Sequence, residues 1–85
     1  MILTVYPHFA RVNNTRDQKI LTEFGAHLRA KRKEKKLTLK ALAFEAEVEL
    51  SQIYRIEHGK VNATLTTLKA LAKALDIPFI ELMDF

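Results

Sequence analysis

The stretch from Thr38 to Gly59 constrains the fold most, because two short helical patterns follow one another there almost without a break. The apolar residues of the first pattern recur at helical spacing and are Leu39, Leu42, Ala43 and Ala46. Ile53 and Ile56 define the apolar side of a second helix, and Val48 supplies an apolar residue at the corner. Gly59 suits the left-handed backbone that commonly ends a helix. We therefore predict two helices joined by a tight turn.

Polar side chains occupy the other side of the second predicted helix. Ser51, Gln52 and Arg55 fall on this side, since residues three or four apart share one face of a helix. A short helix with an apolar back and hydrogen-bonding side chains in front meets the requirements for reading base edges in the major groove. These three residues are therefore candidates for contact with DNA.

The length and composition are those of one small domain. The 85 residues fall within the usual range for a single domain and leave room for only a small core. The chain has no cysteine, which excludes a disulfide scaffold, a thiol nucleophile and a cysteine-based zinc site. No apolar run approaches the roughly 20 residues that span a membrane, and the first residues do not resemble a signal peptide. We therefore expect a cytoplasmic protein with no membrane partner, no cofactor and no bound metal.

Positive charge is concentrated in a block directly before the two predicted helices. The net charge is +4. Residues 29–36 contain only Glu34 as a counter-charge to Arg29, Lys31, Arg32, Lys33, Lys35 and Lys36. Such a block attracts phosphate, a membrane surface or an acidic protein. It also suits a solvated helix end, because cations interact favourably with the C-terminal end of the helix dipole. Its position before the two helices favours phosphate.

The N-terminal residues 1–14 form a separate extension in this interpretation. Residues 2–6 are rich in strand-forming side chains, and Pro7 ends the run. A lone strand has unpaired backbone groups on both edges. We therefore expect it to pair with the same strand of a second subunit or to lie along the domain. An arm that touches DNA through Arg11 and Arg16 is the alternative.

Residues 15–85 predict one helical domain. A first helix begins within 15–17 and runs to about Lys35, and Gly25 inside it suggests close approach by another helix. Its buried stripe consists of Ile20 or Leu21, Phe24 and Leu28. Thr64 caps a fourth helix, whose expected core residues are Leu65, Leu68, Leu71, Ala72 and Leu75. A short fifth helix follows over 79–83.

The whole pattern resembles the helix-turn-helix of the phage repressor and Cro-type (XRE-like) transcriptional regulators. The matching residues are Leu42, Ala43, Ala46, Val48, Ile53, Arg55, Ile56, Glu57 and Gly59, then Asn62, Thr64, Leu65, Thr67, Leu68, Ala72, Lys73, Ala74 and Leu75. The resemblance covers roughly residues 24–82. It implies an all-α, five-helix, lambda-repressor-like DNA-binding domain. It further implies a homodimer on a two-fold operator in double-stranded DNA, most often as a repressor.

The resemblance also implies roles for individual residues. Base edges are expected to meet Leu50, Ser51, Gln52 and Arg55. Phosphates are expected at Thr38, Lys40, His58, Lys60 and Asn62. Arg32 and Glu57 occupy the positions of a structural ion pair between the first and third helices. The dimer contact is expected at Phe79, Leu82, Met83 and Phe85, although Phe79 and Leu82 suit packing on their own core equally well.

Three departures from the family pattern favour a second interpretation. Leu39 stands where a glutamine often contacts phosphate, and Glu47 where glycine is common in the turn. Glu49 stands where serine or threonine usually caps the recognition helix. Glu45, Glu47 and Glu49 together place negative charge near the expected path of the phosphates, unless these side chains point away. The alternative is therefore a protein-interaction module, such as an antitoxin, whose last residues hold a toxin; RNA polymerase is another expected protein partner.

An enzyme is not expected from this sequence. His8, His27 and His58 are scattered and have no metal-ligand spacing. The chain has only two glycines, which excludes a glycine-rich phosphate loop. Ser51 is the sole serine, and no histidine has an evident relation to it.

Overall fold

The computed structural model of the protein describes residues 17–85, and the predictions for residues 1–14 lie outside this part. The described residues form five α-helices and no strand, which confirms the all-α prediction. In chain order the helices are α2 Gln18–Glu34, α3 Leu39–Ala46, α4 Leu50–Glu57, α5 Leu65–Leu75 and α6 Phe79–Leu82. None of these helices is long and apolar enough to cross a membrane.

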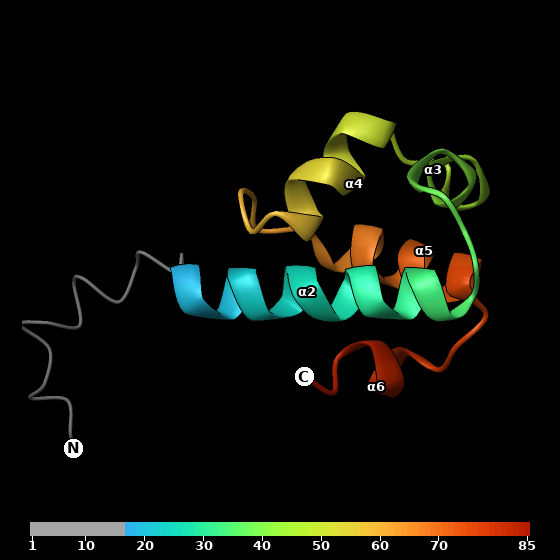
Figure 1. Ribbon diagram of the computed structural model, residues 1–85. Helices are drawn as coiled ribbons and strands as arrows, with labels where there is room; N and C mark the ends of the chain where they lie inside the picture. Colours follow the sequence, from blue (N-terminus) through green and yellow to red (C-terminus); the bar gives the residue numbers. More distant parts are fainter. Residues whose placement is uncertain (1–16) are drawn as a thin grey trace, which may run out of the picture.

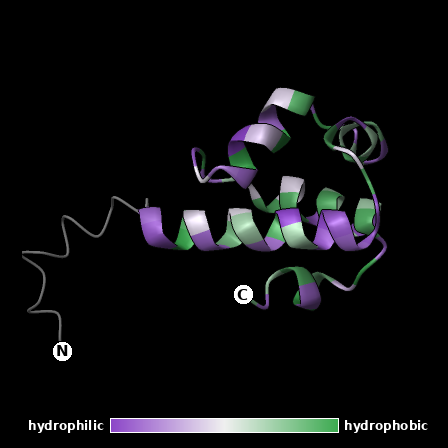
Figure 2. Ribbon diagram, viewed as in Figure 1, coloured by the Kyte–Doolittle hydropathy of each residue, from purple (hydrophilic) through white to green (hydrophobic). Residues whose placement is uncertain are grey.

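Helix α2 is the longest element, and the others are arranged around it (Figure 1). In this view α3 and α4 lie on one side of α2 and α6 lies on the other. Helix α5 contacts α3 and α6, so it links the two halves of the domain. Figure 2 shows α5 largely hydrophobic, whereas α2 alternates between hydrophilic and hydrophobic bands, as expected of a helix with only one side in the core.

Side-chain caps begin three of the helices where the sequence predicted them. Asp17 accepts hydrogen bonds from the backbone N–H groups of Lys19 and Ile20, at 3.0 and 3.3 Å. Thr38 and Thr64 each cap a helix in the same way, through the N–H group three residues later. Each cap satisfies backbone donors that the first turn of a helix leaves unpaired.

Left-handed residues end several helices and set the tight connections. Gly59 has φ 68°, as predicted for the end of α4. Glu47 has φ 58° in the turn between α3 and α4, and Asp76 has φ 57° at the end of α5. A non-glycine residue in this conformation costs about 1–2 kcal/mol. The turn between α3 and α4 therefore carries strain at Glu47, where the family pattern commonly has glycine.

The core lies between α2, α3, α4 and α5 and is closed by α6. Its fully buried large side chains are Leu28, Leu42, Ile53, Ile56, Leu71, Leu75 and Leu82. One expectation is corrected here. Leu65, expected in the core, is 66% exposed because it lies on the first turn of α5, beyond the packed side of the helix. Of the two alternatives for the first turn of α2, Leu21 is partly buried and Ile20 is 48% exposed.

Candidate nucleic-acid interface

Helix α4 has one buried side and one open side, as its sequence predicted. Ile53 and Ile56 are 0% and 2% exposed and hold the helix on the core. On the opposite side Ser51 and Arg55 are exposed and Gln52 is partly exposed. Leu50, at the start of the helix, is 44% exposed. The four residues predicted to meet bases therefore share one accessible surface, which we call the α4 outer face (residues 50, 51, 52 and 55).

Close backbone contact with α2 sets the position of α4. Gly25 of α2 packs against the C-terminal end of α4, where a Cβ atom would lie 2.6 Å from the carbonyl oxygen of Ile56 and closer still to that of Glu57. Only glycine permits this approach, because a real Cβ does not come so near to backbone atoms. The close helix approach predicted from Gly25 is confirmed.

A buried ion pair joins the same two helices. Arg32 donates from Nε to Glu57 Oε2 at 2.7 Å and from Nη2 to Oε1 at 3.0 Å. Its Nη1 donates to the carbonyl oxygen of Leu37 at 3.0 Å. The hydrogen bonds to Glu57 raise the pKa of Arg32 above its ordinary value, against the opposing effect of burial. The two residues expected to form a structural ion pair are therefore hydrogen-bonded to each other, and the pair joins α4 to α2.

A second set of contacts surrounds His58, directly after α4. The His58 ring stacks on Tyr54 with centroids 4.0 Å apart, and its Nδ1 lies 2.8 Å from the Tyr54 carbonyl oxygen. A carbonyl only accepts, so Nδ1 carries the proton in this contact. Nε2 faces Arg29 Nη2 at 3.5 Å and accepts from it. Both ring nitrogens are therefore used within the protein, and the predicted phosphate contact from His58 requires one of these contacts to break.

The other residues predicted to meet phosphate lie on both sides of α4. Thr38 and Lys40 are exposed at the start of α3, where the Thr38 hydroxyl accepts from the N–H of Ala41. Lys60 and Asn62 are exposed in the loop that follows α4. In Figure 1 this loop and α3 flank α4 on opposite sides. The arrangement is consistent with phosphate contacts on either side of an inserted helix, which remain a prediction.

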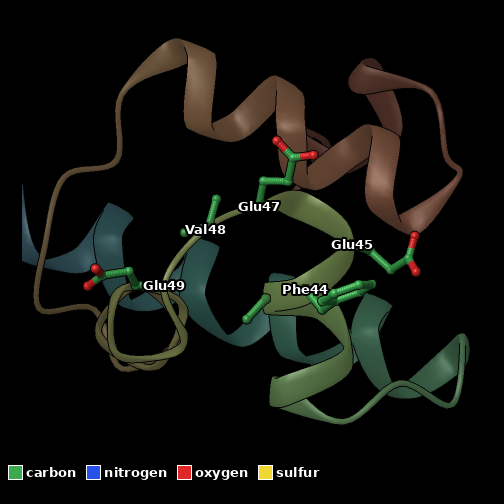
Figure 3. A pocket seen from close by; sticks show the side chains of 6 residues that line it. Phe44, Glu45, Glu47, Val48 and Glu49 are labelled. Carbon is green, nitrogen blue, oxygen red and sulfur yellow. The ribbon is translucent and has the colours of Figure 1, made fainter.

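The acidic corner between α3 and α4 divides into two parts (Figure 3). Glu45 and Glu47 extend toward α5, where they border a hollow together with Lys73. Glu49 instead lies at the start of α4 and makes no side-chain cap. Phe44, on the same corner, is 80% exposed. Only Glu49 therefore brings its carboxylate to the beginning of the α4 outer face.

The C-terminal residues predicted to form a dimer contact differ in their exposure. Leu82 is completely buried, so it belongs to the core and offers no surface to a second subunit; its predicted role in the dimer contact is corrected. Phe85 is 47% exposed and packs edge-on against Phe24, with centroids 5.3 Å apart. Met83 is 36% exposed, and partly buried Phe79 lies under the Lys69 ammonium at 4.9 Å.

The two short helices, the tight turn and the polar outer face of α4 define a helix-turn-helix protein. The family model described as helix-turn-helix matches residues 28–82. The chain therefore belongs to the helix-turn-helix family, in its repressor and Cro-type (XRE-like) branch.

Two curated relatives have names that describe repressors. The chain is 45% identical over 64 residues to the HTH-type transcriptional repressor RghR of Bacillus subtilis (strain 168), covering 74% of this chain and 47% of that protein. It is 43% identical over 53 residues to the immunity repressor protein of Bacillus phage phi105, covering 62% of this chain and 37% of that protein. The chain thus spans less than half the length of either relative.

Two solved structures share the fold. The restriction-modification controller protein C.AhdI from Aeromonas hydrophila superposes with a TM-score of 0.72 at 39% identity, covering 73% of this chain and 94% of that chain. The clp gene regulator ClgR from C. glutamicum superposes with a TM-score of 0.71 at 25% identity, covering 75% of this chain and 83% of that chain. The five-helix arrangement is therefore that of known helix-turn-helix regulators.

Proposed function

We propose that the protein is a transcriptional regulator, acting as a repressor, that binds double-stranded DNA with sequence specificity. The observation that carries the proposal is the α4 outer face. It presents Ser51, Gln52 and Arg55 on a helix whose position is held by Gly25 and by the Arg32–Glu57 pair. A rigid, exposed helix with these hydrogen-bonding groups suits insertion into the major groove.

The bound form in this proposal is a homodimer on a two-fold operator. One α4 would enter each major groove, with half-sites about one helical turn apart. Lys40, Lys60 and Asn62 would meet phosphates beside each groove, and these contacts carry no sequence information by themselves. Met83, Phe85 and the exposed part of Phe79 supply apolar surface for the subunit contact. The protein would act in the cytoplasm, on the nucleoid, and we expect no catalytic activity.

Repression is supported by the names of the two curated relatives. Both are named as repressors, and the chain matches them over 64 and 53 residues. A bound dimer would block access of RNA polymerase to the DNA. No cofactor enters this mechanism.

A protein-interaction module is the second candidate, and the exposure of Phe44 favours it. This aromatic side chain is 80% exposed beside Glu45 and Glu49. An exposed aromatic group with acidic neighbours suits a basic protein partner better than DNA. Such binding would not require the α4 outer face.

Selection of bound duplexes from a random DNA pool tests the proposal. The purified protein is incubated with the pool at physiological salt, and the bound sequences are read after several rounds. We expect an inverted repeat. We also expect the logarithm of the affinity for this site to fall linearly with the logarithm of the salt concentration. The matched variant Arg55→Ala should lose the preference at one base pair per half-site, by about 1–3 kcal/mol of discrimination.

The alternatives give different results in the same experiment. A pool that stays random, with retention that disappears as salt rises, would contradict sequence-specific binding. A recovered site without two-fold symmetry would contradict the dimer. The Phe44→Ala variant serves as the control, since it should leave DNA selection unchanged while weakening any contact with a basic protein.

A further inference from the structure

Arg55 and Gln52 are hydrogen-bonded to each other on the α4 outer face. Arg55 Nη2 donates to Gln52 Oε1 at 3.1 Å. The two residues lie three apart, so they are neighbours on one side of the helix. A guanidinium carries only donors, so the Gln52 group that faces it must be the amide oxygen, which is the acceptor. The pair is therefore a directed interaction between two residues that were expected to act independently.

This bond limits what Gln52 can do at a base. A glutamine that reads adenine uses its amide oxygen to accept from N6 and its amide N–H to donate to N7. In this protein the oxygen is turned toward Arg55. Gln52 is also only partly exposed, whereas Arg55 is exposed. Gln52 is thus arranged to support its neighbour, and Arg55 is the residue that extends outward.

The same hydrogen bond favours contact between Arg55 and guanine. The guanidinium is a planar fork with five N–H donors, and one donor at Nη2 is directed to Gln52. The donors that remain can form two parallel hydrogen bonds, and guanine offers two acceptors, O6 and N7, at the matching spacing. Holding the plane of the fork reduces the conformational freedom that a long side chain loses on binding.

Comparison with Arg32 shows why the neutral partner matters. Arg32 is paired with both oxygens of a buried carboxylate, so its charge is compensated inside the protein. Arg55 is braced by an uncharged amide. Its full positive charge therefore stays available for the electronegative edge of a guanine. Arg32 therefore has a structural role, whereas Arg55 is available to an acceptor outside the protein.

We infer that Gln52 is a positioning residue for Arg55, and that the pair reads a guanine in each half-site while Gln52 itself reads no base. The inference rests on the proposed function, because it requires a specific DNA site. It assigns one G·C base pair of the operator to Arg55 and removes Gln52 from the base-contacting residues.

The test uses DNA selection and binding with the wild-type protein and the variants Gln52→Ala, Gln52→Glu and Arg55→Ala. The wild-type protein should select a guanine at the base pair whose preference disappears in Arg55→Ala. Gln52→Ala should lower the preference for guanine at that same pair by about two- to tenfold, the effect of one hydrogen bond. Its affinity for non-specific DNA should stay the same, since no charge changes. Gln52→Glu keeps an acceptor oxygen but compensates the charge of Arg55, so it should retain guanine as the preferred base and weaken binding to the site.

A double variant separates positioning from independent reading. If Gln52 acts through Arg55, adding Gln52→Ala to Arg55→Ala should cause no further loss at that base pair. Gln52→Ala that leaves the guanine preference intact, or that removes the preference at a different base pair, would overturn the inference but leave the proposed function standing. A wild-type selection that stays random would overturn both. Circular dichroism melting of each variant confirms that the compared proteins are folded.

Discussion

Helix α2 contacts α4 on one side and α6 on the other, and the two contacts are built differently (Figure 1). Toward α4, the charged pair Arg32–Glu57 has side chains that are only 11% and 2% exposed. Toward α6, the charged pair Lys31–Glu81 is 3.0 Å apart, with side chains 19% and 43% exposed. A further hydrogen bond on this side runs from His27 Nε2 to the Glu81 carbonyl oxygen at 3.0 Å.

The difference in burial between the two ion pairs indicates that the α2–α4 contact is the more rigid of the two. A buried charge that loses its partner is strongly unfavourable, so any movement of α4 that separates Arg32 from Glu57 is costly. Gly25 reinforces this by allowing backbone contact at the same junction. Exposed ion pairs are worth little because water and salt screen them. Helix α4 is therefore held firmly on α2, whereas α6 is held by partly exposed contacts.

The largest effect is expected from removing the buried carboxylate. Glu57→Ala leaves Arg32 buried without its partner and should lower the free energy of unfolding by about 3–5 kcal/mol. Urea denaturation followed by circular dichroism measures this change. The double variant Arg32→Met/Glu57→Leu is the control and should lie close to wild type, because it removes both charges. A loss below about 1 kcal/mol in the single variant would mean that the pair does not fix α4.

The second test adds one methyl group between α2 and α4. Gly25→Ala should lower the free energy of unfolding by about 2–3 kcal/mol, because the new Cβ overlaps carbonyl oxygens of α4. The overlap outweighs the roughly 1 kcal/mol that alanine gains over glycine in a helix. The neighbouring Ala26 is exposed, and Ala26→Gly serves as the reciprocal control, with a loss of about 1 kcal/mol from helix propensity alone. Stabilisation by Gly25→Ala would contradict the close approach.

A smaller effect is expected on the α6 side. Phe85→Ala removes the edge-on contact with Phe24 and should lower the free energy of unfolding by about 1 kcal/mol. Ile80, which is 78% exposed, provides the control, since Ile80→Ala should change stability by less than about 0.5 kcal/mol. The measurement is repeated at several protein concentrations. A loss for Phe85→Ala that grows with concentration would indicate that this side chain also contacts a second subunit.

The smallest effect concerns the partly exposed Lys31–Glu81 ion pair and its dependence on pH. The hydrogen bond to Glu81 raises the pKa of Lys31 above its ordinary value. A raised pKa means that the contribution is fully present below the unfolded-state pKa and is lost as the pH rises through the folded-state pKa. The melting temperature of Lys31→Met should therefore lie slightly below wild type at neutral pH and meet it as the pH rises through the raised pKa of Lys31. A difference that persists in strong alkali would show that Lys31 acts through packing of its hydrocarbon chain.

Local patterns were sufficient to predict the helices and the polar side of α4. The caps at Asp17, Thr38 and Thr64 and the left-handed end at Gly59 each depend on residues close in sequence, and all four are observed. The Arg32–Glu57 pair joins distant segments, so it was predicted only from the resemblance to a family. The roles of the α4 outer face in binding remain predictions, although its residues are exposed together as expected.

The errors occur where two elements meet. Leu65 and Leu82 both follow the apolar spacing of a helix, yet Leu65 is 66% exposed and Leu82 is 0% exposed. Spacing identifies which side of a helix is apolar, but not how far along that side the neighbouring helices extend. The position of α6 across the core decides that Leu82 is covered, and the length of the packed part of α5 decides that Leu65 is not.

The sequence by itself determined the helices, their caps and the division of α4 into an apolar and a polar side, because these features depend on residues within one or two helical turns. Tertiary structure alone decided which side chains of different helices contact each other. It brings Arg29 to Nε2 of His58, turns Glu45 and Glu47 toward α5, and buries Leu82 completely. These outcomes depend on the packed positions of whole helices and on side-chain rotamers, which no local pattern contains.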